Sequence, residues 1–353
     1  MGQFFTLPPR QLSIFLEKVL AKGHRVIAPQ KKGLVRFEEL HNAKNLYLKE
    51  NSYFPLKEYF FGKHETIFEY NNAKIRIPKI KTQQKIFFGI RRCDLNAIAH
   101  QDLVFLSGKH PDPYYTARRK GSVFIGYHCN TPPSKYCFCG SLDLEDFYDI
   151  MIWRKKEYFL LHVQTKAGEK FLKPFLSLFK KKKYSLTQKD QKIPGTNLLK
   201  KKNIRKLYGS RDWEKGAAMC LSCSACTTLC PTCYCHELSD IPDLKKSGTG
   251  KRVRCWSSCQ LKSFTRVAGN HIFREKRVQR FKHRIYHQLE YFKEKNGKNL
   301  CVGCGRCISG CPTRIDFISL INSMEPSKKK ISQKMQKKIH KRFPVSAYTK
   351  ENF

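Results

Sequence analysis

The chain has 353 residues, with 69 Lys and Arg against 28 Asp and Glu and a formal net charge of +41. This length fits about two domains, and a hydrophobic share of 41% allows a core but requires a very polar surface. No apolar run of about 18 residues is present, so we expect no membrane span. The excess charge suggests an acidic partner, such as nucleic acid, an anionic membrane or an acidic protein; a solvated basic surface is the alternative.

The sixteen cysteines predict a reducing compartment. A secreted disulfide scaffold is usually short and follows a signal peptide. The first residues, MGQFFTLPPRQLSIF, show no basic region followed by an apolar one. We therefore expect a cytoplasmic protein whose clustered cysteines are reduced thiols that bind metal.

The first part of the chain, residues 1–165, is predicted to form an α/β domain. Apolar residues recur at helical spacing in residues 10–23, and a short strand pattern follows at 24–28. Residues 85–90 and 122–127 are apolar runs typical of buried strands, and residues 94–106 between them have a helical pattern. Strand, helix and strand in this order indicate an α/β domain.

The rest of the chain is predicted to contain three further parts. Residues 166–206, with lysine runs and a Pro-Gly turn, are expected to be a basic linker or insertion. Residues 207–325 are rich in cysteine, and an apolar stripe along residues 273–289 has helical spacing, so we predict a mainly helical metal-binding domain. Residues 326–353 are expected to be a frayed basic tail. The fold class is therefore α+β overall.

Two segments of the second domain have the same cysteine pattern. CLSCSACTTLCP at residues 220–231 and CVGCGRCISGCP at residues 301–312 both read C-x2-C-x2-C-x3-C-P. This is the run of bacterial ferredoxins, in which the fourth cysteine ligates the other cluster. Zinc prefers separated pairs of ligands, so two complete copies favour iron. We predict two 4Fe-4S clusters, the first held by Cys220, Cys223, Cys226 and Cys311, and the second by Cys301, Cys304, Cys307 and Cys230.

The remaining eight cysteines form two sets. Cys93 and Cys129 follow predicted strands, and Cys137 and Cys139 lie in a Pro-rich loop, so these four could meet at one edge of a parallel sheet and hold a third 4Fe-4S cluster. Buried cysteines without a ligand role are the alternative. The second set is Cys233, Cys235, Cys255 and Cys259, which either form a further metal site or pack behind the first cluster.

Long stretches of the chain resemble a known family. The matching segments are CLSCSACTTLCPTCYC, GKRVRCWSSCQLKSFTRVAGNHIFR, CVGCGRCISGCPTRID, FFGIRRCDLNAIAHQDLVFL and IGYHCNTPPSKYCFCGS. They resemble the iron–sulfur subunit of anaerobic sulfite reductase and the closely similar beta subunit of archaeal sulfhydrogenase. Arg92 and the sequence CWSSC depart from the pattern expected for this family. Because Cys93, Cys129, Cys137 and Cys139 lie within matching segments, the resemblance favours the third cluster.

The resemblance implies an electron-transfer component of an oxidoreductase complex. Such a component relays electrons from a flavin-containing subunit, linked to NAD(P)H or ferredoxin, to a catalytic subunit. We expect that catalytic partner to be a sirohaem sulfite reductase; a nickel–iron hydrogenase is the alternative. No G-x-G-x-x-G motif or P-loop is present, and no independent catalytic site is predicted.

A different class of function is a nucleic-acid-binding iron–sulfur or zinc protein. The high pI agrees with it, but no helix-turn-helix, zinc-finger or RNA-binding signature is present. The arginines at positions 274, 277, 280 and 284 leave two interpretations open. They either neutralise the clusters or dock an acidic partner, or they belong to a solvated basic helix.

Overall fold

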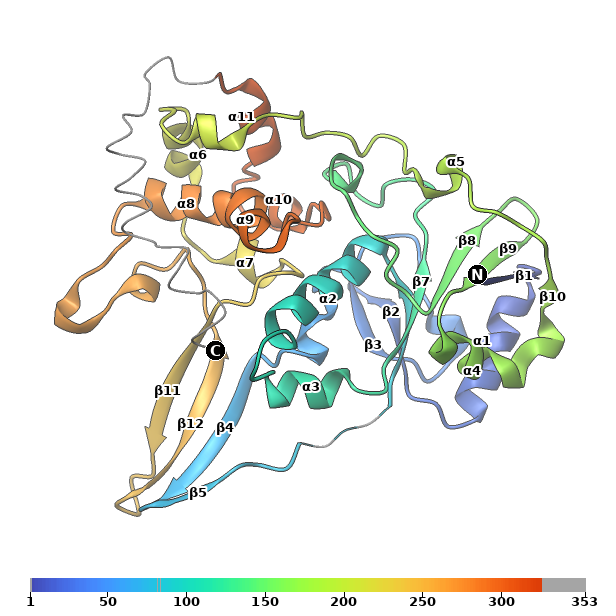
Figure 1. Cartoon of the computed structure of the whole chain (residues 1–353), viewed down its shortest axis with the longest axis horizontal. Helices are drawn as coiled ribbons and strands as arrows, with labels where there is room; N and C mark the ends of the chain where they lie inside the picture. The colour runs from blue at the N-terminus through green and yellow to red at the C-terminus, as the bar shows by residue number, and fades with distance from the viewer. Residues whose placement is uncertain (1, 81, 83, 326–353) are drawn as a thin grey trace.

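The computed structural model describes residues 2–80, 82 and 84–325, and it is organised around an eight-stranded sheet (Figure 1). The strand order is β10-β1-β9-β8-β7-β6-β2-β3. The strands are β1 (Gln3–Leu7), β2 (Val26–Lys32), β3 (Leu34–Glu39), β6 (Ile86–Ile90), β7 (Val123–Tyr127), β8 (Ile150–Arg154), β9 (Phe159–Val163) and β10 (Lys180–Lys181). The strands β2, β6, β7 and β8 run parallel, and the flanking strands pair antiparallel.

Helices cover both faces of this sheet. The helices α1 (Gln11–Ala21) and α4 (Lys166–Leu172) pack on one face, and α2 (Arg92–Phe105) and α3 (Pro113–Arg119) on the other. Every residue of β6 and β7 is buried, which explains why both read as continuous apolar runs rather than alternating ones. The predicted succession of strand, helix and strand is present, with each element within a few residues of its expected bounds.

Part of the segment predicted as a linker belongs to the sheet domain. In residues 166–206, α4 is followed by a 3-10 turn whose Phe175 is buried, and β10 then pairs with β1. Helix α5 (Gln188–Gln191) lies further on, and Ile204 joins the core of the second domain. Phe171, Phe175 and Phe179, four residues apart, come before the first lysine run, and all three are buried. The predicted basic tail, residues 326–353, lies outside the described residues.

Short helices form the second body, above α2 in Figure 1. They are α6 (Trp213–Met219), α7 (Ala225–Thr228), α8 (Arg277–Tyr286), α9 (Phe292–Asn296), α10 (Arg306–Ser309) and α11 (Phe317–Ser323). A π-helical turn, His287–Tyr291, joins α8 to α9. Trp213 is buried in a core with Phe281, Ile285 and Leu289, so this part of the predicted stripe faces inward. Phe273, at the start of the stripe, precedes α8 and is exposed.

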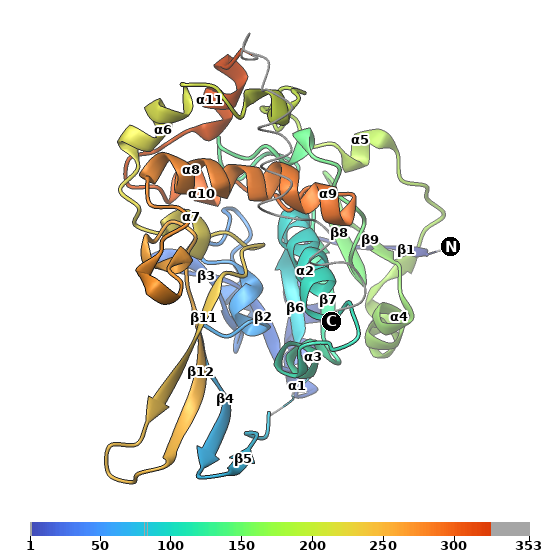
Figure 2. The ribbon, with the colours of Figure 1, turned by 60° about the vertical axis from the view of Figure 1, so that its left-hand side comes forward.

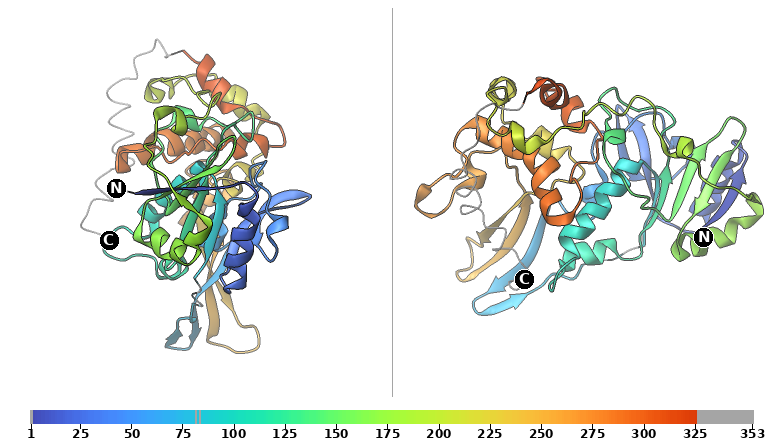
Figure 3. Two further views of the ribbon diagram at one scale, coloured as in Figure 1. Left: turned by 90° about the vertical axis from the view of Figure 1, so that its right-hand side faces the viewer. Right: turned by 45° about the horizontal axis from the view of Figure 1, so that its top comes forward.

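The prediction that the second domain is mainly helical is not confirmed. Between the two cysteine loops, β11 (His236–Pro242) and β12 (Thr249–Trp256) form an antiparallel hairpin. This hairpin pairs with β4 (His64–Asn71) and β5 (Lys74–Arg76) in the order β11-β12-β4-β5. The four strands project as an arm away from the helices and the larger sheet (Figures 2 and 3). Sequence reasoning missed the arm because β12 and β4 come from distant parts of the chain.

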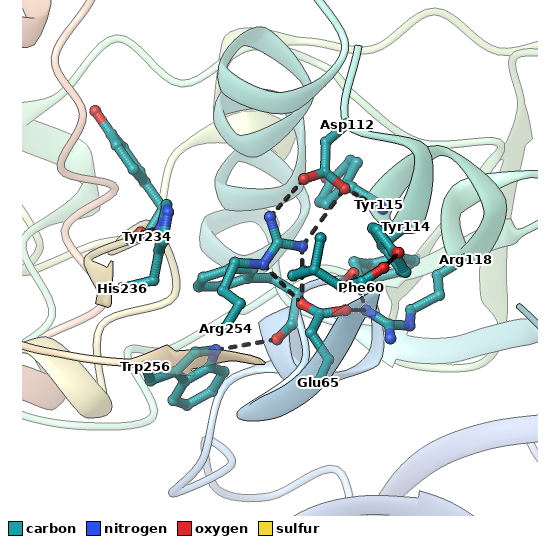
Figure 4. A network of polar contacts seen from close by, with 12 residues as sticks. Phe60, Glu65, Asp112, Tyr114, Tyr115, Arg118, Tyr234, His236, Arg254 and Trp256 are labelled. Atoms are coloured by element: carbon teal, nitrogen blue, oxygen red, sulfur yellow. Dashed lines mark hydrogen bonds and ion pairs between the residues drawn. The ribbon is translucent and has the colours of Figure 1, made fainter. Parts of the chain in front are cut away.

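Buried ion pairs attach the base of the arm to the sheet domain (Figure 4). Arg254 on β12 donates to Glu65 at 2.8 Å and is also paired with Asp112, which caps α3. Glu65 in turn accepts from Arg118 at 2.6 Å. Arg254 and Glu65 are both nearly inaccessible to water, so each charge depends on the others for compensation. The two halves of the chain are therefore joined by strand pairing and by charge.

Candidate metal centre

All eight cysteines of the two ferredoxin-like runs line one cavity. The first run includes α7 and the second includes α10, and α8 contributes residues to the lining of the same cavity. Apolar side chains such as Phe281, Ile285 and Val302 complete the lining. The structure therefore brings together Cys220, Cys223, Cys226, Cys230, Cys301, Cys304, Cys307 and Cys311.

The two cysteine loops have the same backbone geometry. Ser222 and Ser224 in the first loop are left-handed, with φ of 54° and 68°, and so are Gly303 and Gly305 in the second, with φ of 66° and 72°. The amide of Ser222 donates to the Cys220 sulfur at 3.4 Å, and that of Gly303 donates to the Cys301 sulfur at 3.4 Å. Both loops thus wrap a concave surface with amide groups directed at sulfur, as an iron–sulfur cluster requires.

The fourth cysteine of each run contacts the hydroxyl of a threonine two residues further on. Cys230 contacts the Thr232 hydroxyl at 3.2 Å, and Cys311 contacts the Thr313 hydroxyl at 3.4 Å. Burial raises the pKa of Cys301 to about 12, and the nearby Cys230 thiol adds to this effect. Burial also raises the pKa of Cys307, with Cys230 again among the contributing thiols. Cys230 therefore lies close to the cysteines of the opposite run.

The eight thiols are distributed around the cavity and do not converge on a single position. Across residues 2–80, 82 and 84–325, no three Cys, His, Asp or Glu side chains converge as they would on a single metal ion. A zinc ion needs ligands within about 2.3 Å of the metal, whereas a 4Fe-4S cube holds its four thiolates at its corners. The donor set therefore fits two cubes, with four thiols available for each.

Helix α2 joins both loops to the sheet domain. The His100 ring donates from Nδ1 to the Leu300 carbonyl at 3.1 Å, next to the second loop, and the Gln101 side chain donates to the Pro231 carbonyl at 3.0 Å, at the end of the first. At the start of α2, Asp94 forms a two-bonded ion pair with Arg306 at 2.8 and 2.7 Å. Both charges are almost completely buried.

The cysteines at positions 93, 129, 137 and 139 meet against the second loop. The amide of Phe138 donates to the Gly303 carbonyl at 2.8 Å, and a side chain at Gly303 would approach the Cys139 Cα within 2.5 Å. The Cys137 sulfur donates to the Cys304 carbonyl at 3.9 Å. Burial first, and then the thiols of Cys139, Cys304 and Cys129, raise the pKa of Cys137 to about 12. Burial also raises the pKa of Cys93, Cys129 and Cys139, so a cluster bound here would displace thiol protons.

Comparisons with known proteins agree with this geometry. Residues 219–315 match the family model of a 4Fe-4S dicluster domain. The chain is 31% identical over 304 residues to sulfhydrogenase 2 subunit beta of Pyrococcus furiosus, covering 82% of this chain and 88% of that protein. The chain belongs to the sulfhydrogenase beta-subunit family. Among the described residues of this family member, no helix is long and apolar enough to cross a membrane.

In this sulfhydrogenase family member, the remaining four cysteines lie just after the first loop and around the base of the arm. Cys233 and Cys259 are buried. The Gln288 side chain donates to the Cys233 sulfur at 3.7 Å, and the Gln260 side chain donates to the Cys259 sulfur at 3.9 Å. A hydrogen bond to Cys259 raises the pKa of Cys235. Cys255 lies on β12, opposite Glu237 of β11.

Two buried cations beside these cysteines have roles that sequence reasoning missed or left undecided. Lys57 donates to the carbonyls of Thr227 and Cys233, each at 3.1 Å, and lies 4.2 Å from the centre of the Trp256 ring. Burial lowers the pKa of its ammonium group. Arg284 of α8 lines the cavity itself. Its position three residues after Phe281 puts it on the same side of the helix as that buried residue, and this spacing was the signal that could have separated it from a solvated arginine.

Proposed function

We propose that this chain is the electron-transfer subunit of a sulfhydrogenase-type complex, relaying electrons between a flavin-containing subunit that oxidises NAD(P)H and a nickel–iron hydrogenase subunit. The observation that carries the proposal is the single cavity lined by all eight cysteines of the two runs. The family relationship favours a hydrogenase partner. It does not support the sulfite reductase partner that we expected first from the sequence, nor does it support nucleic-acid binding.

We assign the ligands of the two cubes across the loops. Cys220, Cys223, Cys226 and Cys311 hold the first cube, and Cys301, Cys304, Cys307 and Cys230 hold the second. The proximity of Cys230 to Cys301 and Cys307 supports this crossed assignment. It also places the two cubes side by side, because each loop then contributes to both.

A third cube held by Cys93, Cys129, Cys137 and Cys139 would extend the relay. The contact between Phe138 and Gly303 supports a position directly against the second loop. The three sites would then follow one another in a line, from the N-terminal group through the second cube to the first. Of the first loop's cysteines, Cys223 is exposed, so we place the exchange of electrons with one partner at that end.

The chain's own residues control the environment of the relay. A bound 4Fe-4S cluster takes up and releases one electron at a time. The amides of Ser222 and Gly303 direct hydrogen bonds to sulfur, and Phe281 and Val302 keep water away from the cavity. Hydrogen bonds, burial and charge set the reduction potential of such a centre.

Counting iron tests the number of cubes. Anaerobically purified wild-type chain should contain about twelve iron atoms and as much sulfide, since three cubes need four of each. Cys137→Ser should reduce the count to about eight, because a buried ligand of the third site is lost. Cys255→Ser is the matched control, since Cys255 is assigned to no cube, and it should keep the wild-type count.

Two outcomes would contradict this assignment. A wild-type count of about eight that Cys137→Ser leaves unchanged would eliminate the third cube and keep the other two. Zinc in place of iron would eliminate the electron-transfer function altogether.

The partner is tested on the complex purified from its native cells. The complex should contain nickel, and hydrogen gas should reduce the clusters of this chain, as seen by electron paramagnetic resonance. The same sample under argon is the control. A sirohaem absorption spectrum, with clusters that sulfite oxidises and hydrogen does not reduce, would restore the sulfite reductase interpretation.

A further inference from the structure

Arg284 occupies an unusual place for an arginine. Its side chain is only 8% exposed, and it is part of the lining of the eight-cysteine cavity. One guanidinium nitrogen, Nη2, donates to the Cys226 carbonyl at 3.0 Å. Its Nε has no hydrogen-bond partner among the described residues. A buried donor of this kind is costly unless something in the cavity accepts from it.

The other buried arginines find their partners within the protein, carbonyl groups in the case of Arg91 and Arg280 and carboxylates in two further cases. Arg254 pairs with Glu65 and Asp112, and Arg306 pairs with Asp94. Within residues 2–80, 82 and 84–325, by contrast, no carboxylate forms an ion pair with Arg284. An arginine cannot escape the cost of burial by losing its proton. Among the residues that the structure describes, Arg284 has one carbonyl partner and an unpaired Nε, so an anion bound in the cavity would supply the compensation that it lacks.

The groups that affect the pKa of Arg284 most strongly are cysteines in or next to the two loops. Burial lowers the pKa of Arg284, but the charges of the Cys233, Cys230 and Cys226 thiols outweigh this effect and hold it well above its usual value. Cys307 of the second loop adds to the same effect. Arg284 is therefore hydrogen-bonded to the first loop and lines the cavity that the cysteines of both loops share.

A 4Fe-4S core with four thiolates has a net charge of about −2 in its oxidised form. Resting on the proposed function, we propose that Arg284 is the counter-charge shared by the two cubes and that it raises the reduction potential of both. Reduction adds one electron and no proton, so the net charge becomes about −3. A fixed cation stabilises the reduced form more than the oxidised one, and this difference raises the potential.

The test is a reductive titration of the full chain with its clusters, followed by electron paramagnetic resonance. Arg284→Gln should make reduction at least tenfold less favourable, which lowers a one-electron midpoint potential by about 59 mV. Arg284→Lys keeps the charge and should restore most of the shift. Arg280→Gln is the matched control. Arg280 is a buried arginine one turn earlier in α8 that is bound by the carbonyls of Gln260 and Arg274, and its substitution should leave the potentials unchanged.

A second variant keeps the test decisive if Arg284→Gln does not retain its clusters. Gln288→Glu leaves Arg284 in place but adds a carboxylate to the same cavity lining, and it should also lower the potentials. Unchanged potentials in both variants, or equal shifts in Arg284→Gln and Arg280→Gln, would overturn the role of Arg284. Wild-type chain without iron would instead overturn the proposed function, and the inference with it.

Discussion

Cys311→Ser should abolish the cluster of the first loop, even though Cys311 belongs to the second. The expected result follows from crossed ligation, in which Cys311 completes the set of Cys220, Cys223 and Cys226. About four iron atoms should be lost per chain, since a cube with three thiolates and one weak hydroxyl ligand is unstable. The cube of the second loop should remain, because its own four ligands are intact.

Two reference variants identify which cube is lost. Cys223→Ser removes a ligand that only the first cube uses, and Cys304→Ser removes one that only the second cube uses. The remaining paramagnetic signal of Cys311→Ser should match that of Cys223→Ser. The converse variant, Cys230→Ser, should match Cys304→Ser. If Cys311→Ser instead resembled Cys304→Ser, each loop would hold its own cube and the crossed assignment would be wrong.

Arg306→Met should destabilise the chain by about 3–5 kcal/mol of unfolding free energy, because it leaves the Asp94 carboxylate buried without its partner. Asp94 is 1% exposed, and its two oxygens accept from Arg306 at 2.8 and 2.7 Å. Arg306 also donates to the Ser52 carbonyl at 2.7 Å. The pair attaches the second cysteine loop to the start of α2, so its loss should release that loop from the sheet domain.

Anaerobic urea denaturation of the cluster-loaded chain, followed by fluorescence and by iron release, measures this effect. The double variant Asp94→Leu with Arg306→Met should recover a large part of the loss, since it removes both charges. Arg252→Gln is the control. It breaks an exposed pair with Asp240 of similar geometry, which should change the unfolding free energy by at most about 1 kcal/mol. Equal effects of Arg306→Met and Arg252→Gln would show that the buried pair has no special role.

The sheet domain and the cysteine loops could be predicted because their signals are local. The strands β6 and β7 are continuous apolar runs, and the helix between them has a helical pattern. The spacing of each cysteine run dictates a loop with left-handed residues at fixed positions, which Ser222 and Gly303 both adopt. The arm was missed because β12 pairs with β4, a strand that lies more than a hundred residues earlier in the chain.

The sequence by itself determined that this chain contains two ferredoxin-like cysteine loops. The family resemblance left a sulfite reductase complex and a hydrogenase complex as alternatives. Only the tertiary structure decided how those loops are supported. Arg306 meets Asp94 across 212 positions of sequence, and Arg284 reaches cysteines of both runs. The residue type gives the charge of a side chain. Its burial and its ion-pair partner depend on which distant segments of the chain fold beside it. For this reason the sequence of this helix was compatible both with solvated arginines and with an arginine that acts as a counter-charge inside the cavity.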